Sequence, residues 1–180
     1  MRNIRVASWL AFAAGLMLLA GAVAAHDEGA AITKAVAVLH PTEGSRVGGT
    51  IHFSKVEGGI EVRGELKGLS SGQHGFHIHE FGDCSAPDAT SAGGHFNPTG
   101  HPHAGPDAAP RHVGDLGNLT ADESGTAHYE RIDSKLAFNG ASSILGRGLI
   151  VHEKADDLKS QPTGDAGGRL ACGVIGVAKP

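Results

Sequence analysis

The chain has 180 residues and a formal net charge of −4, with 15 Lys and Arg residues against 19 Asp and Glu residues. This acidic balance argues against nucleic acid or an anionic membrane surface as the partner, because both attract clustered positive charge. It does not argue against a small anionic substrate, since an acidic protein can still carry a local positive funnel.

The first 25 residues are typical of a cleaved secretory signal peptide. Arg2 and Arg5 precede an uncharged run, residues 6–25, which ends in small residues. A transmembrane anchor is the alternative, because the run is about long enough to span a bilayer, but its two Gly residues and Ala-rich end favour cleavage. Cleavage after Ala25 removes 25 of 180 residues and two of the 15 basic ones. Residues 26–180 then form one domain of 155 residues with a net charge of −6.

Beyond residue 31, short runs of alternating apolar and polar residues are separated by Gly-rich turns, a pattern that predicts antiparallel strands. Strands are expected at 35–39, 47–56, 59–66, 73–80, 114–119, 125–132, 149–152 and 172–178. The fifth and sixth are expected to pair as a hairpin. No long amphipathic helical pattern occurs, so the sequence predicts an all-β sandwich or barrel. Two long segments, 81–111 and 153–170, lack a regular pattern, and loops of that length are usually functional.

Residues 74–115 hold seven of the chain's 12 histidines. In the expected strand 73–80 the core would take Phe76 and Ile78, so His77 and His79 point together to the opposite face. Their Cα atoms would lie about 6–7 Å apart, within reach of one metal ion. Two exposed strand histidines without a ligand role are the alternative.

The following loop supplies further side chains of metal-binding type. Three imidazoles and one carboxylate are spaced along it: His95, His103, His112 and Asp115. Such a set suits a tetrahedral zinc site. With the strand pair and the distant His152, the chain has enough ligands for two metals, and imidazole-rich sites with an open position suit copper.

Five segments, in the same order and with matching spacing, closely resemble motifs of the copper,zinc superoxide dismutase family: 75–83, 94–98, 111–118, 151–158 and 168–176. The resemblance covers nearly all of residues 26–180. It implies an eight-stranded antiparallel Greek-key β-barrel with two long functional loops. It also implies disproportionation of superoxide to dioxygen and hydrogen peroxide by a redox-cycling copper, bridged through an imidazolate to a structural zinc, in antioxidant defence.

The resemblance implies one copper and one zinc per subunit and a ligand set for each. The copper ligands would be His77, His79, His95 and His152. The zinc ligands would be His95, His103, His112 and Asp115, so that His95 is the bridge and a catalytic residue.

Three further roles follow from the same resemblance. Asp156 would link the ring of His77 to the ring of His103 and orient both. Arg169, the second catalytic residue, would lie beside the copper and attract superoxide. His74 would make structural hydrogen bonds without binding metal.

Cys84 and Cys172 are expected to form a disulfide, because an exported protein meets an oxidising compartment. The resemblance implies the same bond. It would close a loop of 88 residues, for which the chain-entropy model gives about 4–5 kcal/mol of stabilisation.

Two features depart from the family pattern or lie outside it. His101 matches no ligand position and is interpreted as a solvated loop residue, as are His26, His40, His52 and His128. Residues 159–163 form a short segment where many family members carry a longer, charged one that guides superoxide.

Two other functions fit part of the sequence. A cupin-type metal oxygenase is suggested by the His-x-His pattern at 77–79, but its mononuclear site would leave Asp115, Arg169 and the cysteine pair unexplained. A non-catalytic copper carrier predicts ligands without Arg169 or the bridge, and the sequence holds both.

The resemblance also carries expectations about assembly and location. Segments 81–83 and 173–176 resemble the dimer-contact segments of eukaryotic-type members, so a homodimer is expected. The alternative is that of exported bacterial members, which dimerise differently or not at all. The short N-terminal signal favours an exported bacterial member with eukaryotic-like motifs, in the periplasm or else outside the cell. No nucleic acid and, after cleavage, no membrane is expected as a partner.

Overall fold

The computed structural model describes residues 31–180, and the predicted signal peptide lies outside this part of the chain. The described residues form nine strands: β1 Lys34–Pro41, β2 Gly48–Val56, β3 Gly59–Lys67, β4 Gly72–His79, β5 Asp115–Ala121, β6 Ala127–Asp133, β7 Gly148–His152, β8 Arg169–Val174 and β9 Gly176–Val177. One 3₁₀ turn, Thr90–Ala92, lies between β4 and β5. Among these residues, no helix has the length and apolar character needed to cross a bilayer.

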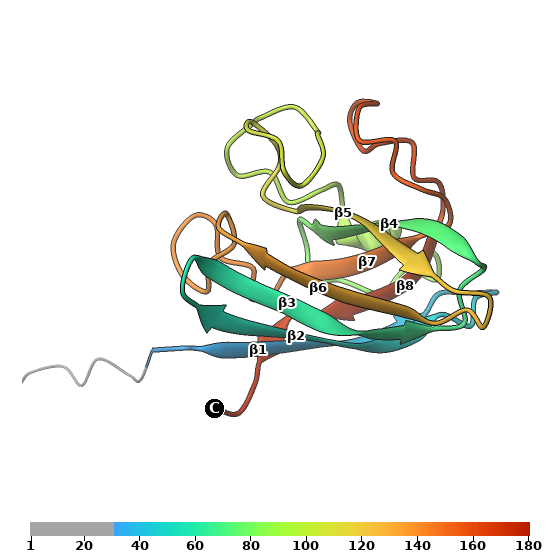
Figure 1. Ribbon diagram of the computed structural model, residues 1–180, viewed down its shortest axis with the longest axis horizontal. Helices are drawn as coiled ribbons and strands as arrows, with labels where there is room; N and C mark the ends of the chain where they lie inside the picture. Colours follow the sequence, from blue (N-terminus) through green and yellow to red (C-terminus); the bar gives the residue numbers. More distant parts are fainter. Residues whose placement is uncertain (1–30) are drawn as a thin grey trace, which may run out of the picture. The chain divides into compact units, whose positions relative to one another are not determined.

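The strands form one antiparallel sheet that closes on itself (Figure 1). Its order is β2-β3-β6-β5-β4-β7-β8-β1, and β1 pairs with both β2 and β8. The connections from β3 to β4 and from β6 to β7 skip neighbouring strands, which is the Greek-key arrangement. The predicted eight-stranded Greek-key barrel is confirmed.

The last predicted strand, 172–178, is divided in the structure. The backbone of Ile175 leaves the sheet to exchange hydrogen bonds with the segment before β7, where its N–H donates to Arg147 O at 2.9 Å and its carbonyl accepts from Gly146 N at 2.8 Å. Beyond it, β9 pairs with β1. Together β8 and β9 therefore correspond to the eighth predicted strand.

The predicted hairpin of the fifth and sixth strands is correct only next to its turn. β5 and β6 pair at Ala121 and Ala127 and then separate, because β6 pairs along its length with β3 and β5 pairs with β4. The ring of Tyr129 packs against Phe76, and its hydroxyl donates to Leu116 O at 2.8 Å. The two strands thus form a corner of the barrel rather than a long ladder.

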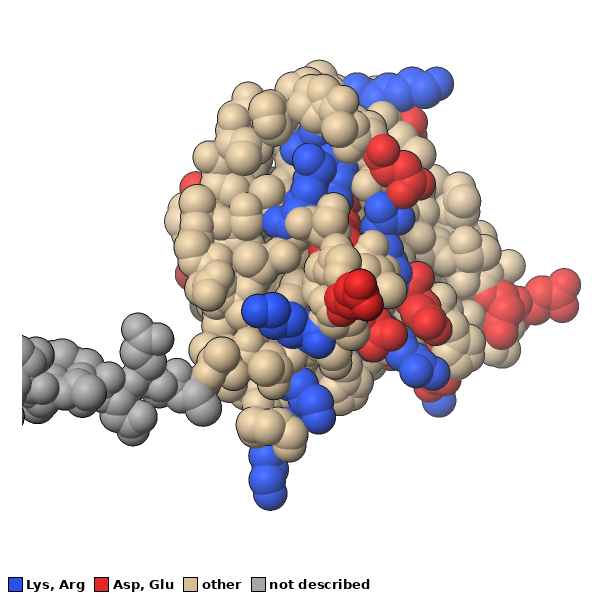
Figure 2. All heavy atoms as spheres, turned by 60° about the vertical axis from the view of Figure 1, so that its left-hand side comes forward, with Lys and Arg blue, Asp and Glu red and all other residues tan. Residues whose placement is uncertain are grey.

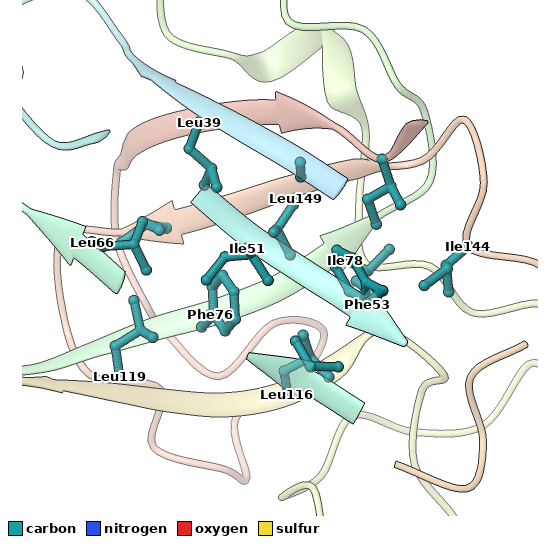
Figure 3. Close-up of a cluster of buried hydrophobic side chains, with 14 of the residues drawn as sticks. Leu39, Ile51, Phe53, Leu66, Phe76, Ile78, Leu116, Leu119, Ile144 and Leu149 are labelled. Atoms are coloured by element: carbon teal, nitrogen blue, oxygen red, sulfur yellow. The ribbon is translucent and has the colours of Figure 1, made fainter. Parts of the chain in front are cut away.

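The barrel interior is filled by the inward-facing residues that alternate along each strand, several of which Figure 3 shows. Ile51 and Phe53 of β2 and Phe76 and Ile78 of β4 are fully buried in this core, as predicted for the last two. Each such side chain contributes about 1.5–3 kcal/mol of burial free energy. This core makes β4 a rigid support for the side chains on its opposite face.

The two long loops lie outside the barrel. Figure 1 shows the loop between β4 and β5 and the loop between β7 and β8 on the same side, over β4, β5 and β7. On the face seen in Figure 2, basic and acidic side chains are interspersed rather than gathered into a patch of one sign. The outer face of β4 is therefore covered by loops, and His77 and His79 are buried although they point away from the core.

Candidate metal centre

Seven side chains converge beneath the two loops in two sets that share one residue. The first set consists of His77, His79, His95 and His152, and the second of His95, His103, His112 and Asp115. In each set the four ligand atoms lie within 4.8 Å of one another, and every residue is buried. The structure thus brings together both sets that the sequence predicted.

The first set is built on two neighbouring strands and one loop residue. Alternation along β4 turns His77 and His79 to the same face, and His152 ends the adjacent β7. The loop that carries His95 pairs with the end of β4 through an isolated bridge between His79 and His95. The hydrogen bond from Phe96 N to Ile78 O, 2.8 Å, extends this pairing.

Backbone carbonyls fix the ring orientation of two residues in the first set. His79 Nδ1 is 2.9 Å from Gly93 O, and His152 Nδ1 is 3.3 Å from Gly167 O. If each Nδ1 donates its proton to the carbonyl, each Nε2 keeps a lone pair, and these two atoms lie 3.3 Å apart. Two lone pairs facing each other are the arrangement that a bound cation stabilises.

The second set is centred on the carboxylate of Asp115. Its Oδ1 lies 2.9 Å from His95 Nδ1, 2.9 Å from His103 Nδ1 and 3.2 Å from His112 Nδ1. Its Oδ2 accepts hydrogen bonds from the backbone N–H groups of His112 and Ala104. Three imidazole nitrogens and one anchored carboxylate are the donor set that tetrahedral zinc sites use.

Unpartnered buried atoms test whether metals fit these sets. Three ring nitrogens in the two sets form no hydrogen bond: His77 Nδ1, His95 Nε2 and His112 Nδ1, the last although Asp115 Oδ1 is 3.2 Å away. Leaving a buried polar atom unpaired costs about 1–3 kcal/mol. Coordination would satisfy all three, so the residues present fit two metal ions.

Asp156 connects the two sets through hydrogen bonds to one histidine of each. Its Oδ2 accepts a hydrogen bond from His77 Nε2 at 2.8 Å, and its Oδ1 accepts one from His103 Nε2 at 2.9 Å. A proton held on each Nε2 leaves each Nδ1 free to bind metal.

Comparisons with known proteins agree with this geometry. The sequence model described as copper/zinc superoxide dismutase matches residues 47–175. The chain belongs to this family. The extracellular superoxide dismutase [Cu-Zn] of Brugia pahangi is 44% identical over 153 residues, which cover 80% of this chain and 76% of the relative. The crystal structure of the clock protein EA4 superposes with a TM-score of 0.75 at 43% identity, over 81% of this chain and 95% of that chain.

As a copper/zinc superoxide dismutase, the protein is an oxidoreductase that converts superoxide to dioxygen and hydrogen peroxide, with one copper and one zinc as its cofactors. The family explains why one chain builds two adjoining histidine sets. A cupin-type oxygenase is excluded, because it would have a single-metal site.

The surroundings of the dismutase histidines set their protonation. Burial lowers the pKa of His77 to about 4, against the opposing effect of Asp156, and burial lowers the pKa of His152 to about 3. Burial also holds the pKa of His79 well below its usual value. For His103 burial acts in the same direction, but Asp115 and Asp156 outweigh it and raise the pKa to about 9. Before metal binds, His77, His79 and His152 are neutral at pH 7, while His103 carries a proton.

Arg169 lies at the edge of the first set. Its guanidinium donates to Ala89 O and Gly93 O, both at 2.6 Å, and Gly93 O is also the carbonyl that holds His79. Ala89 lies in the loop that the Cys84–Cys172 disulfide ties to β8. Arg169 is thus fixed by the same backbone that orients one of the histidines.

The remaining histidines of the described part of the chain lie outside both metal sets. His74 is buried, with Nδ1 2.9 Å from His152 O and Nε2 2.9 Å from Ser70 O, so it supports the end of β7 and belongs to neither metal set. His101 is exposed, as are His40, His52 and His128. His26 lies outside the described residues.

Two amide side chains near the site carried no predicted role. Asn118 donates to Asp156 O at 2.9 Å and accepts from Asp156 N at 2.7 Å. Gln161 contacts the backbone of His103 in the same two-point manner. Asn118 was inside a family motif, which was the one available signal, whereas Gln161 lay in the short segment 159–163 that departs from the family.

Proposed function

We propose that the two histidine sets divide the metals between them. Copper binds His77, His79, His95 and His152. Zinc binds His95, His103, His112 and Asp115. The proposal is carried by the shared residue His95, whose Nδ1 lies 2.9 Å from Asp115 Oδ1 while its buried Nε2 has no protein partner. One imidazole with one nitrogen in each set can bridge two ions.

Copper supplies one-electron redox chemistry at this site, and zinc supplies a fixed charge. Asp156 keeps a proton on Nε2 of both His77 and His103 and so presents their Nδ1 atoms. Nε2 of His95, on the copper side, is buried without a protein partner and can hold a proton when it is not coordinated. Arg169 provides a positive charge that draws in the superoxide anion, at a position set by two backbone carbonyls.

The bridge can be tested by spectroscopy without measuring turnover. With copper in its own site and cobalt in the zinc site, the two ions are magnetically coupled if one imidazolate joins them. We expect His95→Ala to lose this coupling, and His101→Ala, which alters an exposed histidine of the same loop, to retain it. Coupling that survives in His95→Ala would show that another residue bridges. Removal of copper from the wild-type protein should abolish dismutation, and activity that persisted would contradict the copper assignment.

We also propose that residues 1–25 are removed as a signal peptide and that the domain of residues 26–180 is exported. The basic start and small-residue end of the segment support this proposal, as does the extracellular name of the Brugia pahangi relative. The periplasm of a bacterium stays the preferred destination. N-terminal sequencing of the exported protein should begin at His26, and an intact Met1 in that fraction would contradict cleavage.

A homodimer is the proposed assembly. Exposed apolar side chains lie on or beside β1, β8 and β9: Val38 at 50% exposure, Phe81 at 50%, Val174 at 44% and Val177 at 61%. Val38 and Val174 line one groove of 690 Å³. An apolar surface of this kind is what a second copy would cover.

The dimer proposal predicts a clear result in sedimentation. The molecular mass of the mature protein from sedimentation should be twice that of one chain. Val174→Glu puts a charge in the apolar groove, so this variant should have the mass of a monomer. Glu61→Lys, which alters a half-buried residue on the outer side of β3, is a control that changes surface charge elsewhere. A wild-type protein that sediments as a monomer at micromolar concentration would rule the dimer out.

A further inference from the structure

The side chain of Gln161 forms two hydrogen bonds with the backbone of His103. Its Oε1 accepts a hydrogen bond from His103 N at 2.8 Å, and its Nε2 donates to His103 O at 2.8 Å. The second proton of Nε2 is directed at Lys159 O, 3.0 Å away. One amide thus satisfies both backbone polar groups of a buried residue that is 58 positions away in the chain.

Among the described residues, the backbone of His103 forms hydrogen bonds only with Gln161. The loop has no regular structure around His103, and Pro102, which precedes it, has no N–H to donate. The next residue, Ala104, donates its N–H to Asp115 Oδ2 at 3.2 Å. Without Gln161, the N–H and carbonyl of His103 would lose the partners that the structure provides, at a cost of about 1–3 kcal/mol for each buried group.

The loop that carries Gln161 is itself closed. Asp157 accepts hydrogen bonds from the backbone N–H groups of Lys159 and Ser160, and its own N–H donates to Gly164 O at 2.9 Å. Gly164 N donates to Ser160 O at 2.7 Å. These bonds form a small ring of residues, 157–164, with Gln161 at its tip. The ring is a rigid support from which the amide reaches the other loop.

We propose that Gln161 is a positioning residue for the zinc site. It fixes the backbone of His103 so that ring atom Nδ1 faces Asp115 while Nε2 stays on Asp156. The short segment 159–163 thereby has a role at the zinc side of the centre. This inference rests on the proposed function, in which His103 binds zinc.

The test compares Gln161→Met with Gln73→Met. Methionine has nearly the length of glutamine but neither donates nor accepts at these positions. Gln73 is exposed on β4, and no side-chain hydrogen bond is recorded for it among the described residues, so its variant is a matched control. We expect Gln161→Met to bind zinc about tenfold more weakly, measured by chelator competition on the copper-loaded protein.

Two further readouts separate positioning from general stability. Hydrogen exchange at the His103 amide should become faster in Gln161→Met, because the N–H loses its acceptor. The visible spectrum of cobalt bound in the zinc site should change, because the ring of His103 is no longer held in one orientation. Gln73→Met should match the wild type in zinc affinity, exchange and spectrum.

A third variant, His103→Ala, distinguishes the two ways in which the idea can fail. If His103→Ala loses zinc but Gln161→Met keeps the wild-type affinity and spectrum, the positioning role is overturned and the ligand assignment stands. If His103→Ala binds zinc as tightly as the wild type, the ligand assignment is wrong and the positioning role falls with it.

Discussion

Gly164 lies directly against the carboxylate of Asp156, so that a Cβ atom at position 164 would overlap Asp156 Oδ1. The same Cβ would come within 2.8 Å of His103 Nε2, the atom that the carboxylate accepts from. No side chain fits between the returning loop and this hydrogen bond. The absence of a side chain at Gly164 therefore allows the loop to pack against Asp156, the carboxylate that joins the two metal sets.

Replacing this glycine should disturb zinc binding more than it disturbs the fold. Gly164→Ala must displace Asp156 or the loop, and the loss of an orienting carboxylate typically lowers metal affinity by about 10–100-fold. Gly140→Ala is the matched control, because Gly140 has nearly the same backbone angle, φ +69° against +73°, but no atom within 4 Å. Both variants carry the strain of a left-handed alanine, about 1–2 kcal/mol. Equal zinc affinities, measured by chelator competition, would show that the overlap has no consequence.

Arg169 should control how fast superoxide reaches the copper side. Arg169→Ala removes a positive charge held beside the first histidine set, so we expect kcat/KM to fall about tenfold and to depend less on salt. Stopped-flow measurements at several ionic strengths would show both changes.

The control for Arg169 is Arg63→Ala. Arg63 lies on the exposed face of β3, where its nearest acidic partner is Glu130 at 3.9 Å, so the variant changes net charge equally but far from the loops. It should leave the rate and its salt dependence nearly unchanged. An unaltered rate in Arg169→Ala would refute the steering role.

The Cys84–Cys172 disulfide should matter for stability and for Arg169 together. The bond spans 88 positions, and the chain-entropy model gives about 4–5 kcal/mol for a loop of that length, with real values often lower. The bond also joins the loop segment of Ala89 to β8, and the carbonyl oxygen of Ala89 accepts a hydrogen bond from Arg169. Replacing both cysteines by serine should lower the unfolding free energy in denaturant titrations and reduce kcat/KM. A double variant as stable as the wild type would contradict the expected stabilisation.

Most members of the two histidine sets could be predicted because their signals are local, whereas the distant His152 was assigned through the family resemblance. Alternation along β4 makes His77 and His79 share a face whatever the rest of the chain does, and the motif spacing indicated the loop ligands. The same alternation correctly assigned Phe76 and Ile78 to the core.

The parts that escaped prediction depend on contacts between distant segments. In the sequence Gln161 is an ordinary polar loop residue. Its partner, His103, lies 58 positions away and is recognised only when the two loops are packed together. The hairpin at Ala121 was overestimated for a similar reason. A turn signal predicts that two strands meet, but the pairing of β6 with β3 determines where they separate.

Acid should release zinc before copper, because the protonation of the two sets differs. The carboxylates of Asp115 and Asp156 outweigh burial and raise the pKa of His103 to about 9, so below that pH zinc must displace a proton from this ring. Its apparent affinity should fall about tenfold for each pH unit from this group alone. Burial lowers the pKa of His77 to about 4 and that of His152 to about 3, so both rings stay neutral and ready for copper until the solution is much more acidic.

Dialysis of the loaded protein at pH values from 8 to 4, followed by metal analysis, checks this order. Calorimetry adds a proton count, since zinc binding at pH 7.5 should release a proton from His103 that is no longer released above pH 10, where this ring is already neutral. The zinc-free wild type, titrated with copper over the same range, is the reference for the first set. Copper that leaves at a higher pH than zinc would show that the carboxylates do not govern the protonation of His103 as the hydrogen bonds to Asp115 and Asp156 require.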